Sequence, residues 1–138
     1  MNYLSDTCAL SEFLKKLPNE KVVNWYKNQI EESLFVSVLT MGEIDKGIVK
    51  LPLSKRKTEL ETWLENIAFR YDKRILPVTL RIAARWGKLV GELESKGRVL
   101  PILDSLIAAT ALEHDLTIVT RNESDFVETG AKILNVWK

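Results

Sequence analysis

The chain has 138 residues, of which 46% are hydrophobic and 28% are charged. These values are ordinary for a folded globular domain and exclude a disordered or fibrous chain. Twenty basic residues against nineteen acidic ones give a net charge of +1, so no overall positive field indicates a nucleic-acid partner. We expect a single domain over residues 1–138, with any polyanion site confined to a local patch.

Cysteine and histidine are too few for several kinds of site. Cys8 is the only cysteine and His114 the only histidine, which excludes an internal disulfide and leaves no zinc motif. The first six residues have neither a basic leader nor an apolar core, and no run approaches the roughly 20 apolar residues that cross a bilayer. We therefore expect a cytoplasmic protein with no membrane partner.

Strand and helix patterns alternate along the chain. Short apolar runs predict strands at Tyr3–Ser5, Leu34–Val38, Ile75–Val78, Leu116–Val119 and Ile133–Val136. Apolar residues at helical spacing predict helices over 10–17, 19–30, 40–51, 53–68, 82–97 and 101–114. This order favours an α/β fold, namely one three-layer α/β/α domain around a mostly parallel sheet of about five strands. Pro77 places the third strand at the rim.

Four acidic residues are predicted to meet at one edge of this sheet. Asp6 directly follows the first strand, Glu43 comes about one helical turn after the second, and Asp125 lies in the loop after the fourth. Asp104 begins a helix that runs back to the start of the fourth strand, so the beginning of this helix lies at the same edge. In open α/β sheets this edge, at the carboxyl ends of the strands, holds the functional crevice.

Like charges at this edge require a counter-charge. At about 4 Å and an effective dielectric of about 20, two carboxylates repel by roughly 4 kcal/mol. Mg²⁺ and Mn²⁺ prefer carboxylate oxygens, and they activate water for attack on a phosphodiester. Taken singly, each acid also has a structural interpretation: Asp6 as a helix cap, Asp104 as a partner of the helix dipole, Glu43 as a solvated or salt-bridged residue, and Asp125 as the cap of a turn. Only the joint placement favours a metal-dependent hydrolase.

Three sequence blocks carry a resemblance to a known family. They are Tyr3–Glu12 (YLSDTCALSE), Pro101–Ala111 (PILDSLIAATA) and Thr120–Phe126 (TRNESDF). In this order and spacing they resemble PIN-domain ribonucleases, in particular the VapC-type toxins of toxin–antitoxin modules, and the resemblance extends over essentially the whole chain.

The resemblance implies an Mg²⁺- or Mn²⁺-dependent endoribonuclease that cuts RNA, binds a cognate antitoxin, and forms a homodimer or a heteromeric assembly with that antitoxin. The residues matching the family's catalytic and metal-binding acids are Asp6, Glu43, Asp104 and Asp125, and those matching its small polar positions are Thr7, Ser105, Thr120 and Asn122. One position departs from the pattern: Cys8 stands where the family usually has Asn, which we expect to weaken a hydrogen bond to the acids.

Three alternatives follow from the same residues. A phospho-receiver domain is disfavoured because Asp6 has no acidic neighbour and no acid ends the third strand. A nucleotide-binding module lacks a glycine-rich phosphate loop. A catalytically weak PIN-like module that binds RNA or protein stays open, although retention of all four acids argues against it. Lys15, Lys16 and Arg121 are candidates for phosphate contacts near the acidic edge, but scattered surface bases are common.

Overall fold

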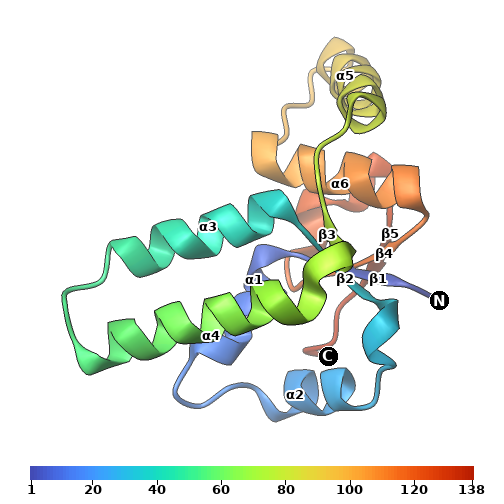
Figure 1. Ribbon diagram of the computed structural model, residues 1–138. Helices are drawn as coiled ribbons and strands as arrows, with labels where there is room; N and C mark the ends of the chain where they lie inside the picture. The colour runs from blue at the N-terminus through green and yellow to red at the C-terminus, as the bar shows by residue number, and fades with distance from the viewer.

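A parallel sheet of five strands runs through the computed structural model, which describes residues 1–138 (Figure 1). The strands are β1 (Tyr3–Ser5), β2 (Leu34–Ser37), β3 (Ile75–Leu76), β4 (Thr117–Val119) and β5 (Lys132–Leu134). All neighbouring pairs are parallel, in the order β3-β2-β1-β4-β5. The predicted α/β architecture is confirmed, and β3 lies at the rim as Pro77 indicated.

Helices cover both faces of the sheet. They are α1 (Thr7–Ser11), α2 (Glu20–Lys27), α3 (Val38–Val49), α4 (Lys55–Tyr71), α5 (Leu80–Ser95) and α6 (Ile102–His114). Short 3-10 helices are η1 (Glu12–Leu14), η2 (Glu31–Ser33), η3 (Asp72–Arg74), η4 (Glu123–Asp125) and η5 (Val127–Thr129). Figure 1 shows α5 and α6 together on one side of the molecule and the long antiparallel pair α3 and α4 extending from the sheet. None of the helices is both long and apolar enough to cross a membrane.

The two-residue period of the strands divides the core between the two faces. Leu4 and Ile118 pair in register, and both are buried in one cluster with Ile107 of α6. On the other face, Val36 is buried against α3 and α4, where it joins a second cluster that includes Leu64. Both faces are therefore apolar, as expected for a parallel sheet covered by helices.

Two expected helices are shorter than their apolar patterns predicted. The 10–17 pattern forms only α1 and η1, after which Lys15 has an extended backbone and Leu17 is 91% exposed. The predicted helix after Pro18 ends at Lys27, and Ile30 is extended and 72% exposed. The prediction that Ile30 belongs to a buried helical stripe was therefore wrong, because contacts distant in sequence fix this connection in a non-helical conformation.

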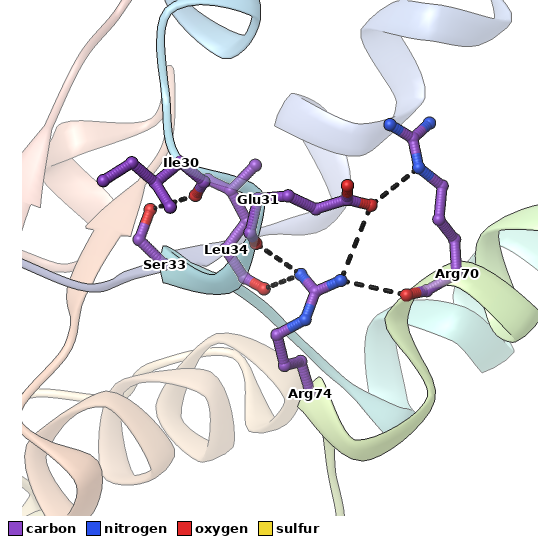
Figure 2. Close-up of polar contacts among 6 residues, drawn as sticks. All are labelled: Ile30, Glu31, Ser33, Leu34, Arg70 and Arg74. Carbon is purple, nitrogen blue, oxygen red and sulfur yellow. Dashed lines mark hydrogen bonds and ion pairs between the residues drawn. The ribbon is translucent and has the colours of Figure 1, made fainter.

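Arg74 supplies those contacts. Its guanidinium donates to the carbonyl oxygens of Glu31 and Leu34, both at 2.6 Å, and to that of Arg70 at 2.9 Å. The Glu31 carboxylate in turn pairs with Arg70 at 2.7 Å, and Ser33 donates to the carbonyl of Ile30 (Figure 2). The entry to β2 is thus tied to the end of α4, and Arg74 supplies a donor to carbonyl groups at the ends of η2, β2 and α4.

Candidate active site

Asp6 is held rigidly at the end of β1. It is the N-cap of α1, and its Oδ1 accepts hydrogen bonds from the backbone nitrogen of Ala9 at 3.0 Å and from Cys8 Sγ at 2.9 Å. Its Oδ2 accepts from Thr120 Oγ1 at 2.5 Å. The residue is 6% exposed, and burial raises the pKa of its carboxyl group although these hydrogen bonds lower it. Asp6 therefore caps α1, as its structural interpretation predicted. The same hydrogen bonds also hold its carboxylate in one orientation.

Glu43 reaches the same edge from α3. This helix begins directly after β2, where the side chain of Ser37 caps it by accepting from the backbone nitrogen of Leu39 at 3.1 Å. Glu43 Oε1 accepts a hydrogen bond from Thr7 Oγ1. Because Thr7 follows Asp6, this bond ties the second acid to the chain segment that carries the first.

Asp104 shows that the four acids share one electrostatic environment. It lies in the first turn of α6. Burial and then the charges of Asp125, Asp6 and Glu43 raise the pKa of its carboxyl group from 3.8 to about 6. Three acids from three other segments therefore act on this carboxyl group, so the structure brings together the residues that the topology argument placed at this edge.

The loop after β4 contributes Asp125 and its supports. Asp125 lies in η4 rather than in an irregular loop, and its backbone nitrogen donates to the carbonyl of Asn122 at 3.1 Å. The backbone nitrogen of Asn122 donates to Thr120 Oγ1 at 3.0 Å, while Asn122 itself is exposed. Thr120 thus contacts both Asp6 and the segment leading to Asp125.

Ser105, also predicted as a supporting polar residue, is engaged elsewhere. It is buried, and its Oγ accepts from Trp86 Nε1 at 2.8 Å and donates to the carbonyl of Ile102 at 2.8 Å. These bonds join α5 to the start of α6. Ser105 therefore fixes the helix that carries Asp104, and its hydroxyl makes no hydrogen bond to an acid.

Cys8 supplies a hydrogen bond to Asp6 at the position where the resemblance predicts an asparagine amide. Its thiol donates to Asp6 and accepts from the backbone nitrogen of Arg121 at 3.4 Å. Burial, followed by the Asp6 charge, raises the pKa of Cys8 to about 12, so the sulfur keeps its proton and serves as a donor. The same high pKa argues against a nucleophilic role, and His114, at the far end of α6, is exposed.

The four acidic side chains have the chemistry that a hard divalent cation requires. All four residues are carboxylates, and the side chains of Asp104 and Asp125 accept no hydrogen bond from other residues, so their oxygens are free to bind a cation. As the side chains stand, no three acidic, histidine or cysteine residues are already positioned to hold a metal ion. A bound cation would offset the repulsion that raises the pKa of Asp104.

Two buried polar residues outside the predicted site were missed by sequence reasoning. Glu12 is 2% exposed and accepts from Trp137 Nε1 at 2.8 Å, which joins η1 to the C-terminal segment. Thr40 is fully buried on α3, one turn before Glu43, and its hydroxyl has no hydrogen-bond partner. The contact between Glu12 and Trp137 joins residues near opposite ends of the chain. No local sequence pattern could have revealed this contact or the buried hydroxyl of Thr40.

Comparison with known proteins identifies the class of fold and site. The family model described as PIN domain matches residues 3–132, and the chain belongs to this family.

Individual relatives match along nearly their full length. The chain is 32% identical to VapC ribonuclease Y4jK of Sinorhizobium fredii over 134 residues, covering 96% of each chain. It is 34% identical to Toxin FitB of Neisseria gonorrhoeae over 135 residues, covering 97% of each. The crystal structure of FitAcB from Neisseria gonorrhoeae superposes with a TM-score of 0.93 at 34% identity, covering 98% of both chains.

Proposed function

We propose that this protein is a metal-dependent endoribonuclease that acts as the toxin of a toxin–antitoxin pair. The observation that carries the proposal is the mutual influence of acids from separate segments: burial, followed by the charges of Asp125, Asp6 and Glu43, raises the pKa of Asp104. Membership of the PIN family and the names of its relatives, a ribonuclease and a toxin, support the same activity.

Each acid has a distinct role in this proposal. Asp6 and Asp104 are the main ligands of Mg²⁺ or Mn²⁺, and Glu43 and Asp125 bind a second ion or orient the attacking water. When bound, such ions neutralise the carboxylates and make water a better nucleophile toward a phosphodiester. Thr7 and Thr120 keep Glu43 and Asp6 in fixed positions, and the exposed amide of Asn122 is available to a phosphate oxygen.

The proposed partners are RNA and an antitoxin encoded beside the toxin. An antitoxin segment that inserts Arg or Lys among the acids would supply the counter-charge otherwise given by metal, and would inhibit by excluding it. A co-crystal structure of the two proteins that lacks such a contact would reject this mode of inhibition. We also propose that the toxin forms a homodimer, alone or within the complex, which light scattering of the purified protein tests.

Cleavage of structured RNA by purified protein tests the activity. Wild-type protein with Mg²⁺ or Mn²⁺ should cut the RNA internally, and EDTA should stop the reaction. Asp6→Asn and Asp104→Asn should reduce the rate by at least about 100-fold, because each loses a charged metal ligand. Equal cleavage by wild type and both variants would mean that the acids are not the active site. RNA binding without metal-dependent cleavage would favour the alternative of a catalytically weak binding module.

A further inference from the structure

A groove opens beside Glu43 where α1 and η1 face α3 and α4. Its volume is about 430 Å³, within the range of sites that bind small ligands. Leu14, Ile44 and Ile48 contribute to an apolar lining, while Glu43 forms part of the wall. Glu43 is therefore shared by the groove and the acidic site, so a chain bound at the acids could extend past Glu43 into the groove.

Two basic residues line this groove without acidic partners. Lys16 is exposed and forms no ion pair. Arg56 donates to the carbonyl of Leu14 but has no carboxylate within ion-pair distance. The neighbouring Lys15, in contrast, pairs with Glu12 at 3.1 Å. Unneutralised Lys and Arg side chains beside an apolar surface suit a ligand with both an anionic group and a flat apolar part.

We propose that this groove binds one nucleotide of the RNA substrate, next to the phosphodiester that lies at the acids. The inference rests on the proposed ribonuclease function. The base packs on the apolar wall formed by Leu14 and Leu51, which line the groove and keep exposed surface, and Lys16 and Arg56 bind the adjoining phosphate. A protein side chain could also cover the apolar wall, but shared use of Glu43 and the two unpaired cations favour the substrate.

Gly47 offers a way to fill the groove without disturbing the fold. It lies on α3 one turn after Glu43, lines the groove and is exposed, and a Cβ atom placed there meets no atom within 4 Å. Leucine also favours a helix more than glycine does. Gly91→Leu on α5 is the matched control. Gly91 is likewise exposed, a Cβ atom placed there also meets no atom within 4 Å, and the residue does not line the groove.

The first test measures binding of a fluorescent single-stranded RNA in an Asp104→Asn background, by anisotropy. Adding Gly47→Leu should weaken binding roughly tenfold, the scale of losing one stacked base. Adding Gly91→Leu should leave it unchanged. Lys16→Gln should weaken binding and reduce its dependence on salt, because one phosphate contact is lost. This arm does not require cleavage, so it decides on the groove even if the ribonuclease function fails.

The second test uses otherwise wild-type enzyme and maps the cut sites. Gly47→Leu should raise KM more than it lowers kcat and should change the base preferred at one position beside the cut, with Mn²⁺ affinity retained. Unchanged RNA affinity, KM and cut-site preference in Gly47→Leu would overturn the proposal. It would also be overturned if Gly47→Leu and Lys16→Gln weakened only the complex with the antitoxin, because the groove would then be a protein-binding site.

Discussion

Asp104 has a raised pKa, caused first by burial and then by the charges of Asp125, Asp6 and Glu43. In metal-free protein its folded-state pKa is about 6, against an ordinary value of 3.8. Because the folded state binds this proton more tightly than the unfolded chain does, the contribution of Asp104 to stability is greatest below about pH 4. It is lost as the pH rises through about 6.

This sign gives a pH-dependent prediction. With EDTA present, the free energy of unfolding of wild-type protein should fall between about pH 4 and pH 6 by more than that of Asp104→Asn. Urea denaturation at several pH values measures both curves. Identical slopes in the two proteins would show that neither burial nor the neighbouring acids raise the pKa of Asp104 in the folded protein.

Cys8 is the residue that the resemblance predicts to differ from the usual asparagine, and its effect is testable apart from catalysis. Cys8→Ala removes the donor to Asp6, and we expect Mn²⁺ affinity to fall about tenfold, the lower end of the range for losing a partner of a metal ligand. Cys8→Asn restores a donor and should bind Mn²⁺ within about threefold of wild type. Calorimetry measures both affinities, and wild-type affinity in Cys8→Ala would show that the thiol does not position Asp6.

At the scale of elements, the link between η2, β2 and α4 depends on one side chain. Arg74→Met keeps much of the apolar stem but removes the guanidinium that donates to the carbonyl of buried Leu34. The carbonyl of Glu31 keeps the backbone nitrogen of Leu34 as a donor. We expect a loss of about 2 kcal/mol in the free energy of unfolding, because the poorly solvated carbonyl of Leu34 loses its bond to Arg74.

Arg70→Met is the control for this prediction. The Arg70 side chain is 66% exposed, and an exposed ion pair contributes at most about 1 kcal/mol. Thermal or urea unfolding of the two variants compares them directly. Equal losses in both would mean that charge pairing with Glu31, rather than satisfaction of the carbonyls, stabilises this connection.

The strands and their direction could be predicted because each carries a short apolar run bounded by helical patterns. The ends of α1 and α2 could not be predicted in the same way. Leu17 and Ile30 continue an apolar spacing, yet both lie outside helices. For Ile30, Arg74 fixes the adjoining approach to β2 from 40 or more residues away. Local patterns contain no information about such a contact.

The same distinction applies to the candidate site. The expected position of Asp6, Glu43 and Asp104 at one edge follows from the parallel direction of the strands and the direction of the helices, which sequence patterns predict. The hydrogen bonds that orient them do not follow from these patterns. Thr120 contacts Asp6 across 114 positions of the sequence. The hydrogen bond from the Cys8 thiol to Asp6 depends on the orientation of a single side chain. Neither contact can be predicted from a local sequence pattern.

At the scale of the whole molecule, the fold explains why acids from four separate segments meet. Parallel strands β1, β2 and β4 end at one edge, and α6 begins there. The apolar contacts on both faces of the sheet fix these elements in place, so folding brings the acids together despite their repulsion. We therefore expect this site to bind divalent cations in preference to any other acidic patch on the protein.

Anomalous diffraction from crystals soaked in Mn²⁺ near pH 7.5 tests this expectation most directly. We predict a strong peak within bonding distance of Asp6 and Asp104, which disappears in crystals of Asp104→Asn. No peak among the four acids, under conditions in which the dissolved protein cuts RNA with Mn²⁺, would contradict it.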